Sequence, residues 1–96
     1  MHLDKAKKRI SKKVKMGFQG YPTLGITYLG PNEGFANEVQ LEFVSEEGVD
    51  PQIERFATEG DIREDQTIQS AIVKMIERSG AQSVILSDGV EFSTEE

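Results

Sequence analysis

The chain has 96 residues, of which 36% are hydrophobic and none is cysteine, and its formal net charge is −6. That length fits one domain with one modest core, and the missing cysteines exclude disulfides, thiolate catalysis and cysteine-ligated metals. No apolar run approaches the ~20 residues that span a bilayer, and no apolar segment follows the charged N-terminus as in a secretory signal, so we expect a cytoplasmic protein without membrane contact.

Residues 1–15 form a basic segment ahead of an acidic remainder. Seven lysines and arginines against Asp4 give this segment a net charge of +6, while residues 16–96 hold four cations against sixteen carboxylates, a net of −12. Apolar residues recur in the segment at intervals of three and four, which predicts a short helix surrounded by lysines. We expect an arm at residues 1–15 and a single α+β domain at residues 16–96, and we expect the fold to survive deletion of residues 1–13.

Two segments with alternating apolar and polar side chains follow, at residues 23–29 and 37–44. This period is typical of half-buried strands, and GPNEG at residues 30–34 is typical of a turn between them. The segments therefore predict an antiparallel hairpin. The side chains expected to face the core are Leu24, Ile26 and Tyr28 in the first segment and Val39, Leu41 and Phe43 in the second.

Residues 51–59 fit two interpretations. Asp50 and Pro51 could begin a short helix that ends at Gly60, whereas the alternation across Ile53 and Arg55 predicts a third strand. We favour the strand, because a two-stranded hairpin is only marginally stable without a further partner.

The next segment predicts a long helix. Asp61 or Asp65 caps its beginning and Gly80 ends it. Its apolar residues recur at helical spacing and are expected to pack against the sheet. The helix positions are Ile68, Ala71, Ile72, Met75 and Ile76, and the sheet positions are Val39, Leu41, Phe43 and Ile85.

A continuous apolar run, SVIL at residues 83–86, predicts a strand that is buried on both faces inside the sheet. Asp88 and Gly89 after it predict a two-residue hairpin turn. The order β-β-β-α-β behind the basic segment predicts an α+β fold, a small mainly antiparallel sheet with one long helix on one face. The strand after the helix could run parallel to a neighbour through a right-handed crossover.

This element order, with residues 71–89 (AIVKMIERSGAQSVILSDG), resembles the first half of ribonuclease-H-like folds over about a fifth of the chain. The resemblance matches Asp88 to the acid that follows a strand in those enzymes, whose two-metal chemistry requires several converging carboxylates. The family has another acid on the first strand, where this chain has none, and one in the helix, where it has Gln66 or Thr67. The resemblance therefore implies a degenerate ribonuclease-H-like fold without a complete set of catalytic carboxylates.

No other pattern indicates catalysis or a cofactor. His2, the only histidine, lies at the terminus, where it supports neither a catalytic triad nor a zinc site. The glycines of residues 17–34 match no nucleotide-binding loop. The acids and arginines of residues 54–65 lack the spacing of a calcium loop and indicate a solvated face with ion pairs, a hard-cation site being the alternative. We therefore expect no catalytic residue, metal ligand or cofactor.

The basic segment carries the remaining hypotheses. Its candidate contact residues are Lys5, Lys7, Lys8, Arg9, Lys12, Lys13 and Lys15. They could neutralise the acidic body or bind phosphates, and the lack of an aromatic residue within the segment favours neutralisation. We expect a non-enzymatic protein that binds a protein partner or a second copy of itself, with a nucleic-acid-binding accessory protein as the alternative. An arm packed on the domain favours the first hypothesis, and a free arm the second.

Overall fold

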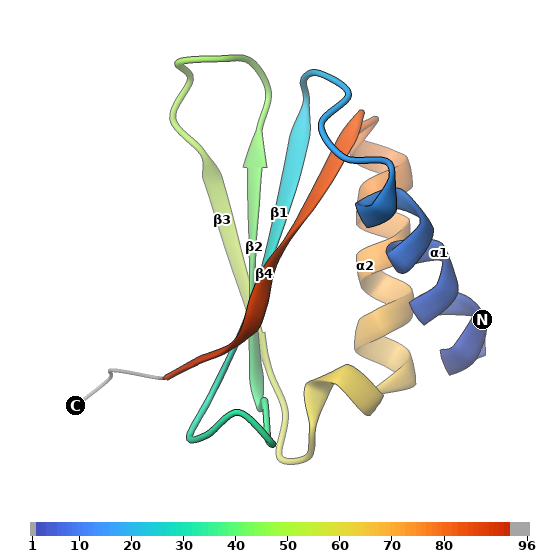
Figure 1. Ribbon diagram of the computed structural model, residues 1–96, viewed down its shortest axis with the longest axis vertical. Helices are drawn as coiled ribbons and strands as arrows, with labels where there is room; N and C mark the ends of the chain where they lie inside the picture. The colour runs from blue at the N-terminus through green and yellow to red at the C-terminus, as the bar shows by residue number, and fades with distance from the viewer. Residues whose placement is uncertain (1, 93–96) are drawn as a thin grey trace.

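The structure, a computed structural model, describes residues 2–92, with the backbone alone at residues 88, 91 and 92. Four strands form one sheet in the order β3-β2-β1-β4, antiparallel except that β4 runs parallel to β1. Both helices lie on the same side of this sheet (Figure 1). The elements in chain order are α1 (Leu3–Lys15), β1 (Thr23–Gly30), β2 (Glu38–Val44), β3 (Gln52–Ala57), the short 3-10 helix η1 (Ile62–Glu64), α2 (Gln66–Ser79) and β4 (Ser83–Phe92). The predicted α+β fold is confirmed.

The predicted hairpin is formed by β1 and β2, and residues 51–59 contain the third strand that we favoured. Ile26 lies opposite Leu41 in the antiparallel register, and both side chains are buried beneath the helices. Strand β3 pairs with the far edge of β2 and is exposed along most of its length, with Phe56 half-buried. The alternating period therefore placed the correct residues on the covered face, while the opposite face of the sheet stays open to solvent.

The prediction that residues 83–86 form an interior strand buried on both faces is wrong. Strand β4 lies at the edge of the sheet, and of the apolar residues 84–86 only Val84 is buried in the core, whereas Ile85 is 49% exposed on the open face. The predicted contact of α2 with Ile85 is wrong for the same reason. The predicted turn at residues 88–89 is also wrong, because β4 continues through a bulge between the pairs of Leu86 and Val90, with Gly89 at φ +64°.

Helix α2 begins and ends as its sequence predicts. The Asp65 carboxylate accepts a hydrogen bond from Ile68 N at 3.0 Å, and Gly80 adopts the left-handed conformation that ends many helices. Ile72 and Ile76 are buried as expected. Gln69 and Val73 are buried as well, although they were not predicted, because α1 covers the flank of α2 on which Val73 lies. The other predicted positions, Ile68, Ala71 and Met75, are half-buried.

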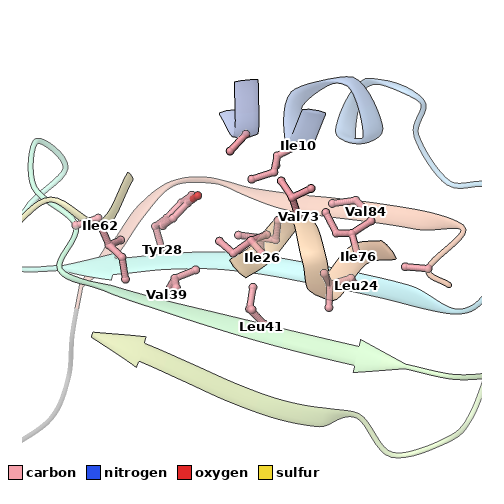
Figure 2. Packing of buried hydrophobic residues seen from close by; sticks show 14 of the residues in the cluster. Ile10, Leu24, Ile26, Tyr28, Val39, Leu41, Ile62, Val73, Ile76 and Val84 are labelled. Atoms are coloured by element: carbon pink, nitrogen blue, oxygen red, sulfur yellow. The ribbon is translucent and has the colours of Figure 1, made fainter. Parts of the chain in front are cut away.

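Helix α1 packs against α2 and β4, so the basic segment is part of the folded unit, the arrangement that we expected to favour a protein partner or self-association over nucleic acid. Ala6 and Ile10, two members of its predicted apolar stripe, are buried in the core. Figure 2 shows Ile10 among the core side chains, near Val73 and Val84. The domain boundary at residue 15 stays a prediction, but this packing no longer supports our expectation that the fold survives deletion of residues 1–13.

The core lies between the covered face of the sheet and the two helices (Figure 2). Its fully buried side chains include Leu24, Ile26, Val39, Leu41, Ile62, Ile72 and Val84. Within residues 2–92, no helix is both long enough and apolar enough to cross a membrane.

Candidate interaction surface

The acidic residues around the start of α2 stabilise local structure. The Asp61 carboxylate accepts hydrogen bonds from the backbone N, Nε and Nη2 of Arg63 at 3.0, 3.0 and 2.8 Å. These hydrogen bonds lower the pKa of the Asp61 carboxyl. Asp65 caps α2, and Glu64 pairs with α1. Across the described residues, no three His, Cys, Asp or Glu side chains are grouped so that they could hold a metal ion. Caps and ion pairs therefore account for these acids.

The element order behind the ribonuclease-H resemblance is present, since α2 connects β3 to a strand parallel to β1. Asp88, the residue matched to the family's acid, has its side chain outside the described part of the structure. Gln66 and Thr67 are exposed in the first turn of α2 and supply no carboxylate. His2 precedes α1 without a side-chain capping hydrogen bond. The described side chains thus give the resemblance no catalytic group.

Two of the seven predicted contact residues pair with the acidic body. Lys7 Nζ lies 2.9 Å from Glu64 Oε2, and Arg9 Nη1 lies 3.4 Å from Glu77 Oε2. All four side chains are largely exposed, and an exposed pair contributes up to ~1 kcal/mol. These contacts join α1 to η1, just before α2, and to the last turn of α2, so neutralisation involves part of the basic segment.

The other five predicted residues, Lys5, Lys8, Lys12, Lys13 and Lys15, form no ion pair with any side chain that the structure describes. Four of them follow one another at intervals of three, four and three residues, which places them along one side of α1. We call this row, Lys5, Lys8, Lys12 and Lys15, the lysine ridge. It is exposed, lies opposite the buried Ala6 and Ile10, and spans about 15 Å of helix axis.

An open groove of about 300 Å³ lies beside the lysine ridge, between α1 and α2. Val73 and Ile76 of α2 provide apolar lining. The cationic side chains of Arg9, Lys12 and Lys13 line the α1 side. Glu77 of α2 also lines the groove and pairs with Arg9, so Lys12 and Lys13 remain as the cations without a described partner. The groove therefore combines an apolar wall with positive charge, a combination that suits an anionic ligand with an apolar part.

The segment after α1, residues 17–22, presents two exposed aromatic rings, and we call it the aromatic loop. Phe18 is 61% exposed and Tyr21 39% exposed, with ring centroids 5.6 Å apart in an edge-to-face arrangement. Ser83 fixes the loop to the start of β4, because its Oγ accepts a hydrogen bond from Gln19 N at 2.6 Å and donates one to Gly20 O at 2.7 Å. This pair of exposed rings was not predicted from the sequence. Its signal was two large aromatic residues between glycines.

A buried polar contact lies deeper under α1 and was also missed. Gln69 Nε2 donates hydrogen bonds to Tyr28 Oη at 3.2 Å and to Ile62 O at 3.1 Å. Burial raises the pKa of the Tyr28 hydroxyl. Every buried polar side-chain atom in the described part of the chain has a hydrogen-bond partner. This contact therefore stabilises the core and leaves no polar atom free for a ligand.

Positive and negative charge lie at opposite sides of the molecule. Figure 1 shows α1 and β3 at the two sides, with α2, β1 and β2 between them. The carboxylates of the far side belong to β2, β3 and their connection: Glu38, Glu42, Glu46, Glu47, Asp50 and Glu54. These six carboxylates therefore lie away from the lysine ridge, which reduces the repulsion that an anion at the ridge would meet, whereas Glu64 and Glu77 lie beside α1 and pair with Lys7 and Arg9.

No family model, curated protein or solved structure matches this chain. Function is therefore inferred from the residues of this chain and their geometry.

Proposed function

We propose that this protein is a non-enzymatic binding protein that contacts an anionic macromolecule through α1. The contact surface consists of the lysine ridge, the groove beside it and the aromatic loop. The acids that sequence patterns offered for catalysis act as caps or ion-pair partners where their side chains are described. The absence of cysteine suits a reducing compartment, and we place the protein in the cytoplasm.

The lysine ridge is the observation that carries this proposal. Like charges three and four residues apart destabilise a helix by a few tenths of a kcal/mol per pair. Neutralising the acidic body does not account for the ridge, because its four lysines are exposed and pair with no described carboxylate. An anionic partner supplies the missing counter-charge, and its binding depends steeply on salt.

Heparin chromatography tests the proposal with a generic polyanion. Lys12→Gln with Lys15→Gln removes two charges from the ridge. The matched control, Arg55→Gln with Arg78→Gln, also removes two charges. Arg55 lies in β3, and Arg78 lies on the side of α2 that faces β3. We expect the unmodified protein and the control to be retained and to elute at similar salt, while the ridge variant elutes much earlier.

Circular dichroism of each variant verifies that it is folded, since all four side chains are exposed or line the surface. Failure of the unmodified protein to bind heparin at low salt contradicts the proposal. Equal loss of retention in the ridge and control variants also contradicts it, because it indicates an effect of net charge alone.

Self-association is a second candidate function, favoured by the separation of charge and by the edges of the sheet. The basic α1 of one copy is complementary to the acidic β2–β3 side of another. The edge strands β3 and β4 also carry exposed apolar side chains, Ile53 and Ile85. Light scattering over a range of concentrations, at low and high salt, tests this candidate. A mass that increases with concentration at low salt supports it, and a monomer at every concentration contradicts it.

A further inference from the structure

We infer that the anionic partner is a single-stranded nucleic acid, with its phosphates on the lysine ridge and its bases on the aromatic loop and in the groove. This inference rests on the proposed function and names the class of macromolecule that the α1 surface fits. Three neighbouring features carry it: the row of lysines that pair with no described carboxylate, the exposed pair of aromatic rings, and an apolar groove with a cationic side.

The lysine ridge suits a phosphate backbone. Lysine presents a compact charge on a flexible stem and contacts phosphate without base-specific geometry. The ridge distributes four such charges over about 15 Å, so it follows a linear polyanion. Neutralising four phosphates of a single strand predicts a slope of about −3 for the logarithm of affinity against the logarithm of salt concentration.

The aromatic loop supplies ring surfaces for stacking, which a simple polycation lacks. Lys15 ends α1 and Phe18 follows three residues later, so the two Cα atoms are no more than about 11 Å apart. Exposed rings offer faces on which bases stack, and stacking tolerates every base. The hydrogen bonds from Ser83 hold the loop in place before any ligand arrives. Binding therefore costs little ordering of the loop.

The groove adds an apolar contact next to the same lysines. Lys12 belongs to the ridge and also lines the groove, opposite Val73 and Ile76. A flexible single strand can turn a base toward this wall while its phosphate stays on Lys12. A duplex keeps its bases stacked inside and offers the groove no apolar surface.

Two other anionic partners fit less well. A membrane could take up only the rings of the aromatic loop, because the apolar side of α1 is buried against the protein and is not free to enter lipid. An acidic peptide would satisfy the lysines, but it gives no reason for a fixed pair of exposed aromatic rings beside them. Single-stranded nucleic acid accounts for the charge and the rings together.

Fluorescence anisotropy tests the inference with a labelled oligothymidylate of about 15 nucleotides, a size suited to such sites. A labelled duplex of equal length, heparin, and vesicles of phosphatidylserine and phosphatidylcholine are measured in parallel. Phe18→Ser with Tyr21→Ser removes the rings. The matched control is Val49→Ser with Ile53→Ser, a pair of similarly exposed apolar residues on the β2–β3 side.

We expect the single strand to bind at least about tenfold more tightly than the duplex, with the salt slope given above. The ring variant should lose about tenfold or more of its affinity for the single strand and change its affinity for heparin by less than about twofold. The control should bind like the unmodified protein. Lys12→Gln with Lys15→Gln should weaken the binding of both ligands and reduce the magnitude of the single-strand slope by about half, to about 1.4.

Heparin binding without preference for the single strand overturns this inference and leaves the proposed function intact. The same conclusion follows if the ring variant and its control bind the single strand equally, or if anionic vesicles bind more tightly than the oligonucleotide. Failure to bind either heparin or nucleic acid overturns both proposals.

Discussion

Helices α1 and α2 cover the same face of the sheet, yet different forces hold them in place. Helix α2 has a capping carboxylate at Asp65, a left-handed Gly80 at its end and four buried residues. Helix α1 has no side-chain cap at His2 and buries Ala6 and Ile10. The comparison indicates that local sequence specifies α2 nearly by itself, whereas α1 depends on the surface that receives it.

The charges of the two helices lead to the same conclusion. Basic residues crowd α1, and repulsion between neighbouring lysines disfavours it as an isolated helix. Packing of Ile10 and the pairs formed by Lys7 and Arg9 compensate for part of this repulsion. A helix held by one side leaves its other side available for a partner. Six substitutions, described in four predictions, test the contrast between the helices.

The largest effect is expected in the core under α2. Ile72 is fully buried, so Ile72→Ala leaves a cavity and should reduce the free energy of unfolding by about 2–5 kcal/mol. Denaturant unfolding followed by circular dichroism measures the loss. A reduction below about 0.5 kcal/mol would show that this side of α2 does not face the core.

The same truncation in α1 should have a smaller effect. Ile10 is buried but lines an open cavity between α1, η1 and β4, where neighbouring side chains can relax. Ile10→Ala should therefore cost about 2 kcal/mol, the lower end of the range for such substitutions. Denaturant unfolding under the same conditions gives the comparison. No loss of stability would mean that α1 is peripheral, and deletion of residues 1–13 would then leave the fold intact.

The helix caps provide a matched pair of substitutions. Asp65→Ala removes the carboxylate that accepts from Ile68 N and should cost about 1 kcal/mol. His2→Ala at the equivalent position of α1 should change stability by less than about 0.3 kcal/mol, because His2 makes no side-chain capping bond. Thermal or denaturant unfolding measures both. Equal effects would contradict the difference between the helices.

The smallest effect concerns the ion pair between the helix regions. Lys7→Gln removes the contact with Glu64 and should cost up to ~1 kcal/mol at low salt and less at high salt. Lys8→Gln removes a charge of the lysine ridge that has no described partner, so it should leave stability unchanged or raise it slightly. Unfolding at two salt concentrations separates these outcomes. A larger loss for Lys8→Gln would indicate that the ridge stabilises the fold.

The candidate surface could be predicted only in part. The sequence identifies the lysines and their helical spacing, because both depend on a few consecutive residues. It does not identify which lysines face outward, since that depends on how α1 docks on α2 and β4. It also does not predict the exposure of Phe18, because large aromatic side chains are usually buried. The rings of Phe18 and Tyr21 are exposed because the aromatic loop is attached to Ser83, which lies more than sixty residues later in the chain.

The sequence by itself determined the elements whose signals are local. The period of two predicted β1, β2 and β3, and the cap, the period of 3.6 and Gly80 predicted α2. Tertiary structure decided the rest. Residues 83–86 have the composition of an interior strand, but the sheet is covered on one face and ends at β4, which leaves Ile85 in solvent. Propensity and period act within a few residues, whereas burial depends on the neighbours that the whole fold brings to a position.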